Sequence, residues 1–299
     1  MLDGWGDHPV VAETLREASD ALGEDLARLI HEGPKEELGL TTNTQPVMLV
    51  AGVAAWRVWR AEGGALPAAV AGHSLGEYSA LVAAGVLSLA DAVPLVRFRA
   101  AAMQQAVPVG TGAMAAILGM DAERVKAGCA EAQALFGAGS AEVVEAVNFN
   151  DPAQTVIAGS KAAVDKACEV LKASGAKRAL PLPVSAPFHS SLMKPAADRL
   201  RERLAATAFA APQIPLINNI DVAIETDAER MRDALYRQAF GPVRWVECVR
   251  AIQARGIATV VECGPGKVLA GMSKRIDANI QGAALYDPAT LAEVKALLA

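Results

Sequence analysis

A pentapeptide of the form Gly-x-Ser-x-Gly constrains this chain more than any other segment. Residues 72–76 (Gly-His-Ser-Leu-Gly) follow the short apolar run 67–71 and open a stretch of good helix formers that continues to residue 84. The apolar run is short enough for a buried strand, which places Ser74 on a turn from strand to helix. At both glycines the missing Cβ is expected to let the strand and the helix approach each other. The pattern predicts an α/β fold with Ser74 as a candidate nucleophile, although any strand-to-helix connection can carry it by chance.

The predicted helix start beside Ser74 supplies a second chemical feature. The first N–H groups of a helix have no partner within the helix, so they can stabilise negative charge that develops on a reacting oxygen. The backbone N–H of Leu75 is the donor next to the serine. We therefore expect Leu75 to contribute to an oxyanion hole.

A serine nucleophile needs a base within hydrogen-bonding reach, and the chain has four histidines. His8 and His31 lie in charged segments near the start, and His73 is expected to point to the other side of the turn from Ser74. His189 lies in segment 181–190, where three prolines exclude a helix and favour a stiff, extended loop. His189 is the predicted base, with a histidine that is merely hydrogen-bonded in its loop as the alternative.

Arg99 is predicted to lie on the apolar face of a helix that begins after Ser88. At 100° per residue it shares a narrow face with Ala92, Val96 and Met103. A guanidinium in such surroundings needs an anion, and its two-pronged geometry suits a carboxylate. The alternatives are an internal Asp or Glu partner, or a side chain that extends to solvent.

These motifs resemble those of the malonyl-CoA:acyl carrier protein transacylases of type II fatty acid synthesis. The similarity runs in order along nearly the whole chain. It rests on the segment 72–77 (Gly-His-Ser-Leu-Gly-Glu), Arg99, the Pro-Phe-His at 187–189, the Asn-Asn at 218–219 and the Glu-Cys-Gly-Pro-Gly-Lys at 262–267. Further similar segments are Thr44-Gln45-Pro46, 112–116, 147–150 and 195–197.

The resemblance implies a two-step acyl transfer with malonyl-CoA and acyl carrier protein as partners. Ser74 forms an acyl ester, His189 is the general base, Gln238 orients His189 and the Leu75 N–H binds the oxyanion. Arg99 binds the malonyl carboxylate, and the substrate-binding residues further include Phe188, Asn148 and Gln45. The resemblance implies neither a cofactor nor a metal.

One part of the family pattern is not found in this sequence. The family opens with a buried strand and a Gly-Gln-Gly-Ser-Gln loop, whose Gln supplies a second oxyanion donor. Here the sequence begins Met-Leu-Asp-Gly-Trp-Gly at residues 1–6. Since loss of one such donor lowers turnover by about 10²- to 10³-fold, we expect Met1 to be an internal start of a longer protein.

Composition and patterning exclude several other classes of protein. With 53% hydrophobic and 20% charged residues and a net charge of −5, the chain is neither disordered nor organised around nucleic acid. Its four cysteines are widely spaced without a zinc-site pattern, so reduced thiols are expected. We see no secretory signal and no run that could cross a membrane, which favours a cytoplasmic location.

The order of predicted elements divides the chain into a core and an insertion. Strands at 113–119, 143–150, 154–159 and 177–183, with helices at 121–134 and 161–174, give the order β-α-β-β-α-β of a ferredoxin-like fold. We expect residues 112–180 to form this small subdomain. Residues 1–111 and 181–299 are expected to form a hydrolase-like α/β core with a mostly parallel sheet. Its predicted elements are helices at 9–22, 45–62, 195–207, 228–240 and 245–255 and strands at 214–219 and 259–263.

Two other functions remain open at this point. A serine hydrolase or thioesterase shares the Gly-x-Ser-x-Gly turn, but it usually carries its histidine late in the chain, and no histidine follows His189. A truncated, weakly active or non-catalytic homologue is the other alternative, because of the missing first loop.

Overall fold

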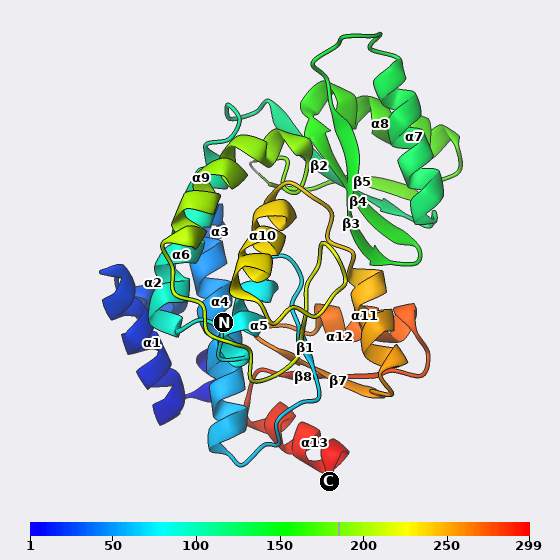
Figure 1. The fold of residues 1–299 in the computed structure, drawn as a ribbon. Helices are drawn as coiled ribbons and strands as arrows, with labels where there is room; N and C mark the ends of the chain where they lie inside the picture. The colour runs from blue at the N-terminus through cyan, green and yellow to red at the C-terminus, as the bar shows by residue number, and fades with distance from the viewer. Residues whose placement is uncertain (185) are drawn as a thin grey trace.

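The polypeptide folds into a large helix-rich part and a smaller part built on one antiparallel sheet (Figure 1). The computed structural model describes residues 1–184 and 186–299. Both chain termini lie in the larger part, and the small sheet with its two helices stands at the opposite end (Figure 1). The α/β class is as predicted from the sequence.

The chain begins with five helical segments. They are η1 (Asp3–Trp5), α1 (Pro9–Leu22), α2 (Leu26–Glu32), α3 (Lys35–Gly39) and α4 (Thr41–Ala61). The ring of His8 caps α1 by accepting a hydrogen bond from the Val10 N–H, and Gly23 ends the helix in the left-handed conformation. Helix α4 is apolar on most sides and lies in the centre of the main core cluster, packed against α1 and α6 (Leu89–Gln104).

The parallel strands of the larger part form two separate pairs among the described residues. Strand β1 (Val70–Ala71) pairs with β6 (Leu216–Ile217), and β7 (Thr259–Cys263) pairs with β8 (Gln281–Leu285). The predicted parallel pairing in this part is confirmed, but the described strands do not join into one sheet. Strands β1 and β6 have two residues each, shorter than the predicted apolar runs, because the chain leaves the ladder for turns at 72–75 and 218–223.

The smaller part contains the strands and helices predicted for residues 112–180. Its elements are β2 (Gly112–Leu118), α7 (Ala122–Ala134), β3 (Val144–Asp151), β4 (Gln154–Ser160), α8 (Lys161–Ala173) and β5 (Arg178–Pro181). The strand order is β3-β4-β2-β5 and every pairing is antiparallel. Asp121 caps α7 at the Arg124 N–H, which explains why the helix starts there.

Alternation along β2 assigns the two faces of this sheet to two clusters. Ala115 and Ile117 belong to the cluster that α7 and α8 cover, whereas Met114 and Ala116 belong to a second cluster on the other face. Phe188, next to the predicted base, packs against both this second cluster and the main core. The sheet thus contacts the segment that carries His189.

Strand β3 joins the two parts of the molecule. Near its end it exchanges two main-chain hydrogen bonds with Val243. The Phe149 N–H donates to the Val243 carbonyl at 3.0 Å, and the Val243 N–H donates to the Val147 carbonyl at 2.8 Å. Asp151 at its last position forms an ion pair with Arg275, with 2.8 Å between the side chains. These bonds fix the sheet relative to the larger part.

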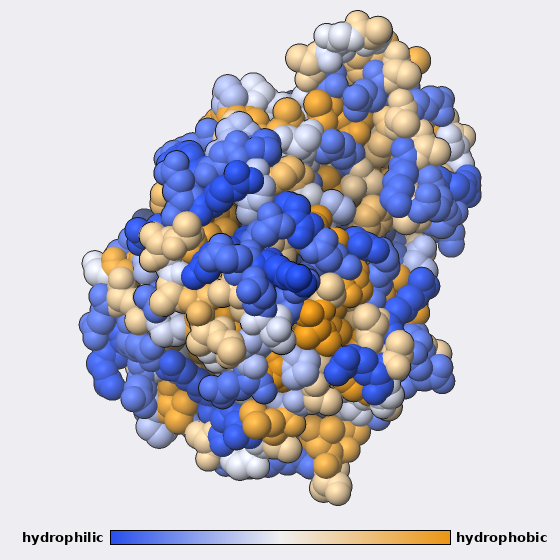
Figure 2. Space-filling view, viewed as in Figure 1, coloured by the Kyte–Doolittle hydropathy of each residue, from blue (hydrophilic) through white to orange (hydrophobic). Residues whose placement is uncertain are grey.

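The remaining elements complete the larger part. They are α5 (Gly76–Ala83), η2 (Ser191–Met193), α9 (Lys194–Ala205), α10 (Ala228–Ala239), α11 (Trp245–Ala254), α12 (Val268–Ile276) and α13 (Pro288–Leu298). Figure 2 shows polar side chains over α9 and α10. This agrees with α9, which buries Ala196, Ala197, Leu200 and Leu204 and exposes its charged residues. No helix of the described chain is long and apolar enough to cross a membrane.

Candidate active site

Ser74 lies on a tight turn between β1 and α5, as the sequence predicts. Its φ of +54° is in the left-handed region, where a residue with a side chain is strained. The side chain of Asn219 holds the turn: its Oδ1 accepts from the Ser74 N–H at 2.7 Å, and its Nδ2 donates to the Gly72 carbonyl at 2.8 Å. Sequence reasoning identified Asn219 only as a similar position, since nothing in the local pattern reveals a contact across 145 residues.

The two glycines of the pentapeptide, Gly72 and Gly76, differ in the space that a Cβ would have. A Cβ on Gly72 would stand 1.9 Å from the Gly76 carbonyl oxygen and 2.5 Å from the Glu77 nitrogen, both of which are backbone atoms. A Cβ on Gly76 would meet nothing within 4 Å. The expectation that both glycines allow the close approach of strand and helix is therefore wrong for Gly76. Gly72 alone provides that approach.

His189 is in direct contact with the serine. Its Nε2 lies 2.6 Å from the Ser74 Oγ, and its Nδ1 lies 2.9 Å from the backbone carbonyl of Gln238. A carbonyl oxygen can only accept, so Nδ1 carries the proton and donates it to Gln238, which leaves the Nε2 lone pair facing the serine hydroxyl. Gln238 thus contacts the histidine through its main chain, and its side chain is free for other partners.

The surroundings of His189 favour the neutral imidazole. The residue is buried at 4% exposure, and this burial, together with the nearby positive charge of Arg99, lowers the pKa of His189 to about 3. A neutral imidazole at ordinary pH is the form that can accept a proton. His189 also has a φ of +67°, so both residues of the pair have strained backbone conformations.

Arg99 is buried at 2% exposure and its hydrogen bonds go to neutral groups. Its Nη1 donates to the Gln45 Oε1 at 2.5 Å, and its Nη2 donates to the Gln238 Oε1 at 3.2 Å and to the Ser74 Oγ at 3.3 Å. No ion pair to an Asp or Glu is found for it in residues 1–184 and 186–299. Both alternatives considered for Arg99, a directly bound acid and extension to solvent, are wrong.

The structure also describes Leu75, Asn148 and His73. The Leu75 N–H follows the serine at the start of α5 and donates to no acceptor in the described chain. Asn148 lies on β3, and its buried Oδ1 has no hydrogen-bond partner among the described residues. The Nε2 of His73 lies 2.8 Å from the Asn150 Oδ1, and its ring packs edge-on against that of Trp245.

Glu77 is a residue of the site to which the sequence analysis assigned no role beyond membership of the segment 72–77. It is buried at 1% exposure in the first turn of α5, and burial raises the pKa of its carboxyl group to about 7. Its Oε2 accepts from the Asn219 N–H at 2.8 Å and from the Gln238 Nε2 at 2.9 Å. A single charged residue in a helix that is mostly apolar was the signal that could have revealed it.

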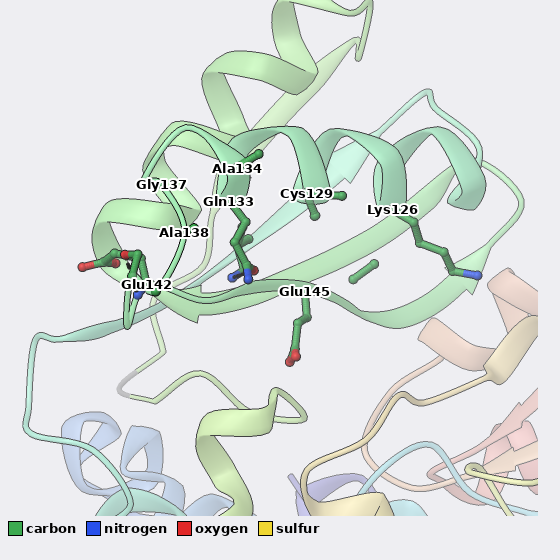
Figure 3. A pocket seen from close by; sticks show the side chains of 13 residues that line it. Lys126, Cys129, Gln133, Ala134, Gly137, Ala138, Glu142 and Glu145 are labelled. Atoms are coloured by element: carbon green, nitrogen blue, oxygen red, sulfur yellow. Dashed lines mark hydrogen bonds between the residues drawn. The ribbon is translucent and has the colours of Figure 1, made fainter.

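A cavity of about 720 Å³ lies apart from these residues. It opens between α7 and β3 and is lined by residues from 126 to 146 (Figure 3). None of the residues predicted for the site lines it, and Glu145 uses its Oε2 to accept from the Ser191 N–H at 2.7 Å. The described residues contain no group of His, Cys, Asp and Glu suited to a metal ion.

An α/β fold with a serine on a strand-to-helix turn and a histidine base beside it defines the class of serine hydrolases and acyltransferases. Comparison with known proteins specifies the family. A model of the acyl transferase domain matches residues 6–285. The chain belongs to the malonyl CoA-acyl carrier protein transacylase family.

Three relatives illustrate the match. The malonyl CoA-acyl carrier protein transacylase of Salmonella typhimurium is 54% identical over 285 residues, covering 95% of this chain and 90% of the relative. An acyl-carrier-protein S-malonyltransferase from Burkholderia pseudomallei, known from a crystal structure, is 63% identical with a TM-score of 0.95, and the match covers 98% of this chain and 94% of that one. A malonyl-transacylase solved in complex with a type II PKS acyl-carrier protein is 51% identical with a TM-score of 0.92, and the match covers 96% of this chain and 91% of that one.

The turn geometry predicts that an alanine destabilises the fold at Gly72 and has little effect at Gly76. We expect Gly72→Ala to lower the free energy of unfolding by about 1–3 kcal/mol or more, because its Cβ would overlap backbone atoms that have no room to move. Gly76→Ala is the matched control, and should stay within about 1 kcal/mol of the wild type. Urea unfolding of both variants provides the measurement, and equal losses would contradict the assignment.

Burial of neutral His189 predicts a pH-dependent stability. In the unfolded chain this histidine takes up a proton near its ordinary pKa of 6.5, whereas in the folded chain it does so only near 3. The free energy of unfolding therefore decreases as the pH falls below about 6.5. Compared with His189→Gln, the free energy of unfolding of the wild type should fall by up to about 1.4 kcal/mol more for each pH unit between pH 6 and 4. Urea unfolding of both proteins at each pH measures the difference, in which the opposite contribution of Glu77 cancels. A constant difference would show that His189 is not buried in the neutral form.

Proposed function

We propose that this chain transfers a malonyl group from malonyl-CoA to the phosphopantetheine thiol of acyl carrier protein through an ester on Ser74. The enzyme is an [acyl-carrier-protein] S-malonyltransferase of fatty acid biosynthesis. The observation that carries the mechanism is the buried guanidinium of Arg99, which forms no ion pair with an acid among the described residues and lies 3.3 Å from the Ser74 Oγ.

The first half-reaction forms the acyl-enzyme. The Ser74 Oγ attacks the thioester carbon while its proton passes to the Nε2 of His189, 2.6 Å away. The C–S bond then breaks, and the protonated His189 gives the proton to the leaving coenzyme A thiolate. The Leu75 N–H would stabilise the oxyanion between these steps, because it has no acceptor in the described protein.

Arg99 selects the acyl group in this mechanism. The free carboxylate of malonyl would pair with a guanidinium whose hydrogen bonds, among the described residues, go to the amide oxygens of Gln45 and Gln238 and to the serine hydroxyl. The pairing fixes the carboxylate end of the malonyl group and thereby the position of the thioester carbon relative to Ser74. An acetyl group lacks the carboxylate and leaves the buried charge unpaired.

The second half-reaction returns the serine. The carrier-protein thiol loses its proton to His189, attacks the ester carbon and displaces the Ser74 oxygen, which takes the proton back. The related malonyl-transacylase solved with an acyl-carrier protein supports this choice of acceptor. Water as the acceptor would instead make the protein a hydrolase.

Asn148 and Phe188 complete the proposed substrate site. The Asn148 Oδ1 is a buried acceptor without a partner in the described part of the chain, so it can accept from an amide of the pantetheine arm. Phe188 lies directly before the base and against the small sheet, where it limits the space for the acyl group. Gln45 acts indirectly, through its bond to Arg99.

We infer that residues 112–180 are an inserted ferredoxin-like subdomain and that residues 1–111 and 181–299 form the hydrolase-like core. The strand order β3-β4-β2-β5 and the two helices on one face support this division. The two connections between the parts follow the Arg99 helix and precede His189, so substrate would bind where the parts meet. The family's Gly-Gln-Gly-Ser-Gln loop, which would add a second oxyanion donor, is not in these 299 residues.

Labelling with radioactive malonyl-CoA tests the proposed function. Wild-type protein should retain the label after denaturation as an ester, and adding holo acyl carrier protein should transfer the label to the carrier. Ser74→Ala should retain none, because the hydroxyl that forms the ester is gone.

Two results would contradict the proposal. Release of the label as free malonate at the same rate with and without carrier protein would identify a hydrolase. Absence of any label on wild-type protein would indicate a non-catalytic homologue.

A further inference from the structure

The side chain of Gln238 links the nucleophile turn to the guanidinium of Arg99. Its Nε2 donates to the Ser74 carbonyl at 3.0 Å and to the Glu77 Oε2 at 2.9 Å. Its Oε1 accepts from the Arg99 Nη2 at 3.2 Å. This connection is separate from the main-chain bond between Gln238 and His189.

The two acceptors determine which way the amide points. An amide nitrogen donates two hydrogen bonds and an amide oxygen only accepts. With Nε2 on the carbonyl of Ser74 and the carboxylate of Glu77, the oxygen must face Arg99. The reversed amide would place oxygen against two acceptors and nitrogen against a guanidinium that only donates.

Glu77 is well placed to enforce this orientation. Its side chain is 1% exposed, and the same Oε2 also accepts from the Asn219 N–H at 2.8 Å, which fixes the carboxyl group against the backbone. The carboxyl group has no direct hydrogen bond to Arg99 among the described residues, so it leaves the guanidinium free for a substrate anion. It therefore acts on Arg99 through one intervening amide.

We propose that Glu77 is a positioning residue, which fixes the Gln238 amide so that Arg99 is held in the orientation that accepts a malonyl carboxylate. The proposal rests on the proposed function and adds to it a determinant of acyl selectivity. What matters is the acceptor atom at the end of a side chain of this length. The negative charge itself is not required, since a neutral amide oxygen at the same place can accept the same two bonds.

The test measures selectivity, defined as kcat/KM for malonyl-CoA divided by kcat/KM for acetyl-CoA in transfer to carrier protein. Glu77→Gln places an amide oxygen at the same reach and should keep the selectivity within about twofold. Glu77→Asp keeps a carboxylate but withdraws it from Gln238, and should lower the selectivity about tenfold, as expected for loss of an oriented bond to a charged group. The same loss is expected for Glu77→Met. A merely structural role would lower both kcat/KM values together and leave their ratio unchanged.

A double-variant cycle tests whether Glu77 acts through Gln238. Gln238→Met keeps the main-chain carbonyl that His189 needs but removes the amide. Because the two residues form one chain of bonds, Glu77→Met combined with Gln238→Met should lose no more selectivity than Gln238→Met alone. Multiplied losses in the double variant would overturn the proposal.

Arg99→Met separates failure of this inference from failure of the proposed function. If wild type and Arg99→Met have the same selectivity, the carboxylate-binding role of Arg99 is wrong and this inference falls with it. If Arg99→Met loses selectivity while Glu77→Asp and Glu77→Met keep it, only the role of Glu77 is wrong. Glu77→Asp retains a buried carboxyl group and provides the readout if Glu77→Met does not fold.

Discussion

The site depends on one buried positive charge to which no acid of the described chain is directly bound. Arg99 is 2% exposed, and its hydrogen-bond acceptors among the described residues are two amide oxygens and a serine hydroxyl. Burying a charge without an ionic partner is unfavourable, and neutral hydrogen bonds offset only part of that cost. Gln45, Gln238 and Glu77 are therefore best understood as the groups that hold a guanidinium in readiness for an anion brought by the substrate.

The same charge also affects the base. Burial is the main reason why the pKa of His189 falls to about 3, and the positive charge of Arg99 lowers it further. The imidazole consequently stays neutral at ordinary pH, with its Nε2 facing Ser74 and its Nδ1 proton on the Gln238 carbonyl. A malonyl carboxylate on Arg99 would oppose this effect, so substrate binding makes His189 a stronger base when a proton must be accepted.

Sequence reasoning found the features that are carried by local patterns. The turn at Ser74, the proline-rich segment of His189 and the order β-α-β-β-α-β each follow from short-range spacing or turn chemistry. It missed what depends on contacts between distant segments: Asn219 closing the turn, Glu77 under Gln238, and strand β8, whose Gln-Gly-Ala-Ala-Leu sequence has little strand preference until β7 pairs with it. It also gave both glycines the same role, because a Cβ collision is visible only when the opposing backbone is in place.

The most direct test of the central claim is the affinity of the Ser74→Ala protein for malonyl-CoA and acetyl-CoA, measured by titration calorimetry with Arg99 present or replaced by Gln. With Arg99 in place, malonyl-CoA should bind about tenfold or more tightly than acetyl-CoA, because only malonyl pairs with the buried guanidinium. Arg99→Gln should abolish the preference, whereas Arg97→Gln should keep it, since Arg97 on the same helix pairs with Glu24 and Asn43. Equal affinities for the two thioesters, or a preference that survives Arg99→Gln, would contradict the account.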